Sequence, residues 1–138
     1  MTTEIMRLTY TYDGDTLGAL TGTGQAVRIR LAYLDAPEID QGNWGIRARA
    51  YLRSLLVINE RIAVDIKGTD YYGRLIAEVL RTRDYGNCGL RLVLGGYVAL
   101  YQCPATQPAY LAAQDMARYA KRGIWAQPGP HQTPWLAR

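Results

Sequence analysis

Three segments typical of strands follow one another in the first quarter of the chain, and only short turns separate them. Residues 7–12 and 27–33 alternate apolar and polar side chains, residues 15–20 lie between them, and Asp-Gly at 13–14 and Thr-Gly-Thr-Gly at 21–24 make the connections. Such alternation indicates strands that bury one face, and Asp-Gly suits a tight hairpin. Since a parallel pair needs a crossover of about a dozen residues, these strands form an antiparallel meander. The meander favours an all-β or α+β barrel.

In the first segment, the alternation predicts that Leu8, Tyr10 and Tyr12 share one face. Further along, residues 45–57 have the period of a helix, with one face carrying Ala48, Leu52, Leu55 and Leu56. Alternation returns at 61–67 and 72–81, which predicts two more strands. A short helix over 87–95 and a helix from Pro108 to Gly123 are also expected, while residues 97–101 between them fit no clear period.

The third strand ends in an acidic turn. Pro37 lacks an N–H group and stops a strand ladder, and the residue before a proline is held extended. The carbonyl of Ala36, flanked by Asp35 and Glu38, would form an oxygen-rich site for a cation beside Arg30. An acidic turn at the end of a strand is also common without any binding function, so this interpretation depends on the rest of the chain.

The spacing within this turn leads to a structural prediction. Arg30 and Asp35 are an odd number of residues apart, so strict alternation would place their side chains on opposite faces of the sheet. Arg30 can serve a metal bound by Asp35 only if a bulge or bend interrupts the strand. We therefore expect a break in the ladder between Tyr33 and Pro37.

The charged residues favour a polyanionic partner. The chain has 16 Lys plus Arg against 12 Asp plus Glu, and all but two of the basic residues are arginine. Arginine binds phosphate with a planar two-pronged geometry that lysine lacks, although a net charge of +4 is also found in proteins that never bind nucleic acid. The 11 tyrosines and 3 tryptophans suit either core packing or base stacking.

The chain is poor in ligands for soft metals. Cys88 and Cys103 are too far apart for a CxxC motif and are expected to be free thiols rather than a disulfide. With one histidine and no paired thiols the chain does not suit zinc, so a cation site would use oxygen ligands and hold calcium or magnesium. His131 lies in the tail, where we expect it to be exposed to solvent and without function.

Length and composition predict a single domain over residues 1–138, with a proline-rich tail from about residue 126. The first residues lack a basic head followed by an apolar run, and no apolar stretch approaches membrane-spanning length. We expect a monomer that contacts no membrane. Its location would be cytoplasmic for the chain as given, or extracellular if a leader has been removed.

Closure of the strands into a barrel would bring polar residues from several turns to one rim, namely Asp13, Asp15, Arg30, Asp35, Glu38 and Arg74. Negative charge accumulates on the oxygens of a phosphodiester as water attacks it, so catalysis needs cations aimed at those oxygens. A metal and two arginines would supply them, and a carboxylate such as Glu38 would take a proton from the water. Taken alone, however, residues 13–16 are more often a plain hairpin turn, and Arg74 could simply pair with Glu78.

Five strings of residues together resemble the staphylococcal-type thermonuclease family, also called the micrococcal nucleases. They occur in the order found in that family and cover nearly the whole chain: DGDT at 13–16, RIRLAYLDAPE at 28–38, WG from Trp44 with the helix after it, DYYGRLIAEV at 70–79 and ARYAKRGIW at 117–125. The resemblance implies an α+β fold, an OB-type five-stranded antiparallel β-barrel with three α-helices. It also implies calcium-dependent hydrolysis of DNA and RNA, preferably single-stranded or locally melted, that leaves 3′-phosphates.

The resemblance implies roles for individual residues. The calcium ligands would be Asp15, Asp35 and the backbone carbonyl of Ala36. Arg30 and Arg74 would be the two catalytic arginines that bind phosphate, and Glu38 would be the catalytic general base.

Three tyrosines are the candidates for binding substrate. Tyr72 matches a tyrosine that helps to hold a terminal phosphate, whereas Tyr71 stands where the best-known member of the family has a lysine, which implies weaker binding of that phosphate. Tyr101 is the nearest match to the aromatic residues that stack on the nucleotide. The loop after Glu38 is also shorter than in that member, which would change how a strand enters the site.

The alternative is a non-catalytic OB-fold module that binds nucleic acid or protein. Degenerate copies of this domain typically lose the acidic residues and the arginines. Here the whole set is present, Asp15, Arg30, Asp35, Glu38 and Arg74, which favours the enzyme.

Overall fold

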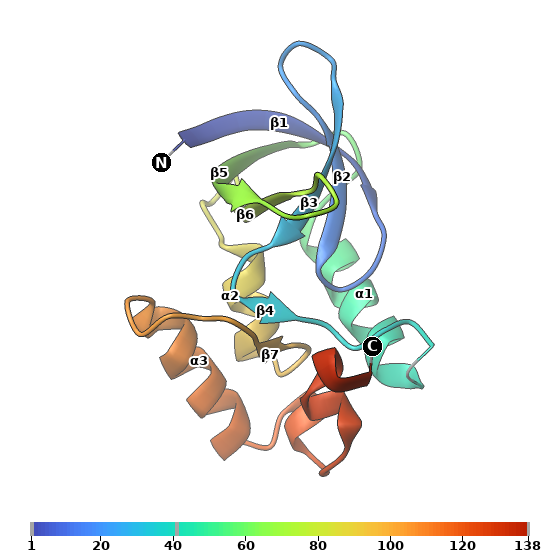
Figure 1. Cartoon of the computed structure of the whole chain (residues 1–138), viewed down its shortest axis with the longest axis vertical. Helices are drawn as coiled ribbons and strands as arrows, with labels where there is room; N and C mark the ends of the chain where they lie inside the picture. Colours follow the sequence, from blue (N-terminus) through green and yellow to red (C-terminus); the bar gives the residue numbers. More distant parts are fainter. Residues whose placement is uncertain (1, 41, 138) are drawn as a thin grey trace.

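The computed structural model of the chain describes residues 2–40 and 42–137. Within them, five strands form a closed barrel and three α-helices gather at one end of it (Figure 1), which confirms the predicted α+β barrel. Neighbouring barrel strands follow the order β1-β2-β3-β6-β5. Their bounds are β1 (Thr2–Thr11), β2 (Thr16–Leu20), β3 (Ala26–Leu31), β5 (Arg61–Thr69) and β6 (Leu75–Arg81).

The barrel is mixed, whereas the predicted barrel was wholly antiparallel. β1, β2 and β3 form the expected antiparallel meander, but β3 and β6 are parallel, with Ile29 opposite Leu75 and Leu31 opposite Ala77. A parallel pair requires a long connection. The segment between β3 and β6 supplies it, because it contains β4 (Leu34–Asp35), α1 (Asn43–Leu55) and β5.

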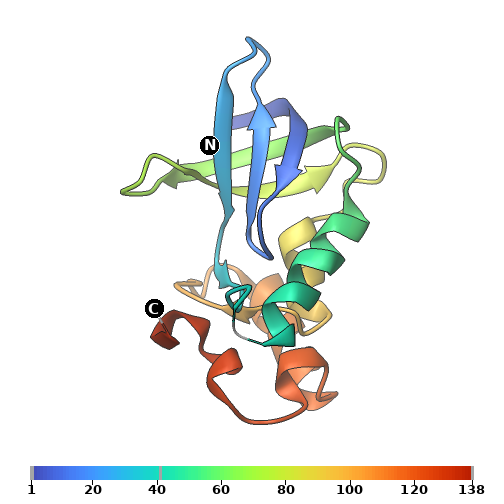
Figure 2. The same cartoon turned by 90° about the vertical axis from the view of Figure 1, so that its right-hand side faces the viewer.

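The helices are α1 (Asn43–Leu55), α2 (Cys88–Leu94) and α3 (Pro108–Tyr119), and Figure 2 shows them together below the barrel with the C-terminal segment. α1 buries Ala48, Leu52 and Leu55, the face predicted from its period. The side chain of Asn87 caps α2 by accepting a hydrogen bond from the amide of Leu90. None of the helices in the described part of the chain is long and apolar enough to cross a membrane.

The barrel interior is apolar. Its fully buried side chains come from every barrel strand and include Leu8, Leu17, Ile29, Ile62, Val64 and Val79. Cys88 and Cys103 are both free thiols, as predicted. Burial raises the pKa of the Cys88 thiol to about 12, so this cysteine behaves as a small apolar residue of the core.

The chain leaves the barrel through a sharp break after Leu31. Ala32 and Tyr33 form a turn in which Tyr33 has a φ of 74°, a left-handed conformation that few residues with a Cβ adopt. The next two residues form β4 (Leu34–Asp35), which pairs with β7 (Ala99–Leu100) in a separate two-stranded sheet. The predicted break is therefore real but starts earlier than the expected interval from Tyr33 to Pro37.

A second irregularity lies in β1, where the pairing with β2 shifts between Leu8 and Tyr10. A bulge of this kind moves the following side chains to the other face. Leu8 and Thr11 are buried, whereas Tyr10 is 48% exposed. The prediction that Leu8 and Tyr10 share a face was wrong because alternation in the sequence does not reveal a bulge.

Candidate functional site

Arg30 is held between two buried carboxylates. Its Nη1 atom lies 2.8 Å from Oδ2 of Asp15 and its Nη2 atom lies 2.7 Å from Oδ1 of Asp35, while the two aspartate side chains are 5% and 0% exposed. Arg30 lies on the outer side of β3 opposite Thr16 of β2, and Asp35 belongs to β4. The break after Leu31 is what brings Asp35 back to Arg30 despite the odd spacing between them.

Asp15 is fixed by more than this ion pair. Its Oδ2 atom accepts a hydrogen bond from the amide of Ala36 at 2.9 Å, and its Oδ1 atom accepts one from the hydroxyl of Thr16 at 2.9 Å. Burial alone would raise the pKa of Asp15, but the charge of Arg30 and these hydrogen bonds lower it below its usual value. Asp15 is therefore an ionised carboxylate that ties β2 to the acidic turn.

Asp13 and Glu38 add negative charge to the same region. Asp13 accepts a hydrogen bond from the amide of Asp15 at 3.1 Å. Burial, the neighbouring charge of Asp15 and, to a smaller extent, the charge of Glu38 raise the pKa of Asp13 to about 7. Glu38 is half-buried, and its backbone lies so close to Gly45 that a Cβ there would come within 2.0 Å of the Glu38 carbonyl oxygen. Gly45 thus lets the start of α1 pack against the turn that carries Glu38.

Arg74 is held by Asp70 in the hairpin between β5 and β6. Its Nε atom donates to Oδ2 of Asp70 at 2.7 Å, and Oδ1 of Asp70 accepts hydrogen bonds from the amides of Tyr72 and Arg74 at 2.9 Å each. Burial opposes the ionised form of Asp70, but these hydrogen bonds and the charge of Arg74 lower its pKa. Among the described residues, no ion pair joins Arg74 to Glu78; Arg74 pairs with Asp70 and Glu78 pairs with Lys67.

Asp70 was not identified as a site residue from the sequence. A signal was present, because an aspartate that begins a turn commonly accepts a hydrogen bond from the amide two residues later. Residues 70–73 have the composition of such a turn.

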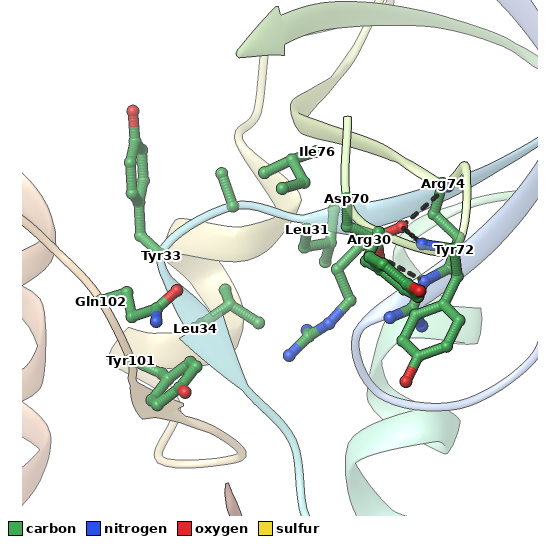
Figure 3. Close-up of a pocket in the computed structure, with 12 residues that line it drawn as sticks. Arg30, Leu31, Tyr33, Leu34, Asp70, Tyr72, Arg74, Ile76, Tyr101 and Gln102 are labelled. Carbon is green, nitrogen blue, oxygen red and sulfur yellow. Dashed lines mark hydrogen bonds and ion pairs between the residues drawn. The ribbon is translucent and has the colours of Figure 1, made fainter. Parts of the chain in front are cut away.

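The two arginines face one cavity of about 580 Å³. In Figure 3, Tyr33 and Tyr101 lie on one side of it, Tyr72 and Arg74 lie on the other, and Arg30 lies between them. Tyr71 also lines the cavity, so the structure brings together both predicted arginines and all three predicted substrate tyrosines. The lining found among the described residues does not include Asp15, Asp35, Ala36 or Glu38. The first two of these lie behind Arg30.

The C-terminal segment contacts two aromatic residues near the site. Trp135 stacks on Tyr101 with ring centres 4.9 Å apart, and His131 stacks on Trp44 with ring centres 4.7 Å apart. The expectation that His131 is exposed was wrong, since it is half-buried in this stack. Neither contact could be predicted from the sequence, because the tail residues are far along the chain from the aromatic residues that they stack on.

The acidic residues around Arg30 offer oxygen ligands for a cation. In the described part of the chain, no three His, Cys, Asp or Glu side chains are grouped so that they could hold a metal ion by themselves. Asp15 and Asp35 are nevertheless both buried against one arginine, and burial together with the neighbouring charge of Asp15 raises the pKa of Asp13. Two carboxylates supplemented by backbone carbonyl and water oxygens suit a hard divalent cation such as calcium.

A small β-barrel whose rim joins buried carboxylates to two arginines over one open cavity has the architecture of an OB-fold nuclease. Residues 28–127 match the family described as staphylococcal nuclease homologue. The chain belongs to this family of nuclease homologues.

Curated relatives agree with this assignment. An uncharacterized endonuclease of Haemophilus influenzae is 36% identical over 86% of this chain, which spans 64% of the length of that protein. An uncharacterized endonuclease of Escherichia coli O157:H7 is 33% identical over 96% of the chain and 83% of that protein. A micrococcal nuclease of Shigella flexneri is 31% identical over 98% of the chain and 79% of that protein.

Proposed function

We propose that this chain is a calcium-dependent nuclease that hydrolyses phosphodiester bonds of both DNA and RNA and leaves 3′-phosphate ends. The observation that carries the proposal is the convergence of Arg30 on β3 and Arg74 in the hairpin between β5 and β6 on one cavity of about 580 Å³. Its aromatic walls would accept the bases of a single or locally melted strand.

The two arginines would bind the phosphate under attack. A guanidinium donates two parallel hydrogen bonds to phosphate oxygens, and it stabilises the charge that develops on them in the transition state. Both arginines are held in place before substrate arrives, Arg30 by Asp15 and Asp35 and Arg74 by Asp70. Such preorganisation lowers the cost of ordering them during the reaction.

Asp15, Asp35 and the backbone carbonyl of Ala36 would hold the calcium ion. Bound calcium would supply positive charge to the phosphate oxygens and bind the attacking water. The buried carboxylates fit this role because both lie against the charge of Arg30 and carboxylate oxygens are the ligands that a hard divalent cation prefers. The resemblance to the family is what favours calcium over magnesium.

Glu38 would act as the general base. It lies in the turn directly after Pro37 and is half-buried, and its charge contributes to the raised pKa of Asp13. A carboxylate in such a place takes the proton of the attacking water. Since Glu38 is outside the cavity lining that the described residues form, it would reach the phosphate through a water molecule.

Digestion of heat-denatured DNA and of RNA, with added calcium and then with a chelator, tests the proposal. We expect both substrates to be cut with calcium, the product ends to carry 3′-phosphates, and the chelator to stop the reaction. Undiminished cutting in the chelator would refute the calcium assignment. Binding of nucleic acid without any cutting would favour the non-catalytic OB-fold module instead.

A matched pair of variants tests the role of Glu38. Glu38→Gln should lower kcat by about two orders of magnitude or more, as expected when a general base is lost, and leave thermal stability unchanged. Glu4→Gln makes the same chemical change at an exposed position of β1 and should keep full activity. Equal rates for the two variants would remove Glu38 from the mechanism.

A further inference from the structure

Two arginines and two tyrosines form a continuous row on the outer surface, from β3 across the end of β1 to α1, and none of the four belongs to the cavity lining that the described residues form. We call Arg28, Tyr12, Tyr10 and Arg53 the arginine–tyrosine row. The guanidinium carbon of Arg28 lies 4.2 Å from the centre of the Tyr12 ring, and the Tyr12 and Tyr10 rings are 5.0 Å apart in an edge-to-face arrangement. Arg53 lies 5.4 Å from the Tyr10 ring and donates to its hydroxyl at 3.3 Å.

Two features of the backbone build this row. The bulge in β1 places Tyr10 outside the barrel, opposite Gly18 of β2. Gly18 lies below the ring of Tyr12, and a Cβ at this position would come within 3.1 Å of Cε2 of Tyr12. The missing side chain lets the Tyr12 ring lie against the sheet beside Arg28, which pairs with Gly18 across β2 and β3. Figure 2 shows these three strands side by side.

The row has a positive charge that no acidic side chain is seen to neutralise. Arg28 is exposed, and across residues 2–40 and 42–137 no carboxylate forms an ion pair with Arg28 or with Arg53. Arg53 donates instead to the carbonyl of Thr11 at 2.9 Å. Exposed guanidinium groups interleaved with aromatic rings have the chemistry that binds single-stranded nucleic acid, since they contact phosphates and stack on bases.

The row is continuous with the candidate active site. Arg28 and Arg30 alternate on the same outer face of β3, because Ile29 between them is buried, and their spacing along the strand is about 7 Å. Tyr12 directly precedes Asp13, which hydrogen-bonds to the amide of Asp15. A strand whose phosphate reaches Arg30 can therefore extend along the barrel over Arg28 and Tyr12.

Resting on the proposed function, we propose that the arginine–tyrosine row is an additional binding site for single-stranded nucleic acid. It holds nucleotides of the substrate that extend beyond the bond being cut. The row would thus favour long, flexible strands over short fragments. It would act through phosphate charge and base stacking, without reading a sequence.

Binding and cleavage of oligothymidylates test this site. The long probe is a strand of about twelve nucleotides, within the range of site sizes for OB folds, and the short probe is a dinucleotide. Fluorescence anisotropy in the Glu38→Gln background measures binding, and kcat/KM in the otherwise unchanged protein measures cleavage. The variants are Arg28→Ala, Arg28→Glu and Tyr12→Ala. The matched controls are Arg118→Ala and Arg118→Glu, because Arg118 is also exposed and stacks on an aromatic ring, that of Trp125 at 5.4 Å.

The row variants should weaken binding of the long strand about tenfold, and charge reversal at Arg28 should have the largest effect. The ratio of kcat/KM for the long strand to that for the dinucleotide should fall by about the same factor, whereas the Arg118 variants leave this ratio unchanged. Removing Arg28 should also reduce the slope of log Kd against log salt by about 0.7.

Equal behaviour of the Arg28 and Arg118 variants would overturn the proposed binding site, and so would wild-type binding that does not increase with strand length. If the wild type cuts neither probe but shows these binding differences, the nuclease proposal fails and the binding site stands.

Discussion

Arg30 and Arg74 face the same cavity from two regions of the chain that hold their side chains differently. The Arg30 side chain is 15% exposed and pairs with two aspartates that are 5% and 0% exposed. The Arg74 side chain is 32% exposed and pairs with one aspartate that is 17% exposed. Because an ion pair gains in strength and in desolvation cost as it is buried, the first region ties the arginine to the stability of the fold. The second region leaves its arginine more accessible to substrate.

The largest effect should follow from Arg30→Ala. Removing this guanidinium leaves two buried carboxylates without the cation that pairs with both, and the loss of one partner from a buried ion pair costs about 3 kcal/mol or more. We expect the free energy of unfolding to fall by about this amount and kcat to fall by about two orders of magnitude or more. Chemical denaturation and initial rates measure the two effects.

Calcium provides a further readout on the same variant. If Asp15 and Asp35 bind the ion, added calcium should raise the Tm of Arg30→Ala more than that of the wild type, because the ion replaces the missing positive charge. A calcium shift that is no larger in the variant would argue against these ligands.

Arg74→Ala should separate activity from stability. We expect a loss of activity similar to that of Arg30→Ala, since both arginines would bind the same phosphate. The free energy of unfolding should fall by less than about 1 kcal/mol, because a partly exposed ion pair contributes little. The same two measurements apply. A stability loss equal to that of Arg30→Ala would remove the contrast between the two regions.

Both regions contain site residues that the sequence predicts, such as Arg30 and Asp35 in the more buried region and Arg74 in the hairpin. In the more buried region the sequence also predicts a feature of the backbone. The odd spacing of Arg30 and Asp35 predicts a break in the ladder, and the structure has this break slightly earlier than expected, at Ala32 and Tyr33. Such predictions succeed because a proline and a strict period of two constrain the backbone over a few residues.

Contacts between distant segments could not be predicted in this way. The parallel pairing of β3 with β6 depends on where a long connection returns, and alternation within each strand does not encode it. The bulge that turns Tyr10 outward and the stacking of Trp135 on Tyr101 are likewise set by tertiary packing. The pairing of Asp70 with Arg74 is different, because the two residues are four apart in one turn whose composition is visible in the sequence.

Asp70→Asn should have an intermediate effect. The amide keeps an acceptor for the turn but loses the charge that holds Arg74. We therefore expect KM to rise about tenfold, because losing a hydrogen bond to a charged group costs about 1.5 kcal/mol. The pKa of Asp70 is lowered in the folded chain. Its contribution to stability is therefore present above the ordinary aspartate pKa of about 4 and is lost as the pH falls through the lower folded value. The Tm difference between wild type and variant should shrink over that range.

Tyr71→Lys should have the smallest effect, and it tests whether the exposed hairpin binds substrate. Tyr71 is 96% exposed and lines the cavity, and an exposed ammonium close to a phosphate gains about 1 kcal/mol in water. We expect the Kd for a nucleotide with a terminal phosphate to fall about fivefold, with the gain lost at high salt and the Tm unchanged. Tyr119→Lys is the control, because Tyr119 on α3 is 93% exposed and lies outside the cavity lining among the described residues. If both lysines tighten binding equally, net charge rather than the position of Tyr71 accounts for the gain, and the hairpin is not the wall that binds the terminal phosphate.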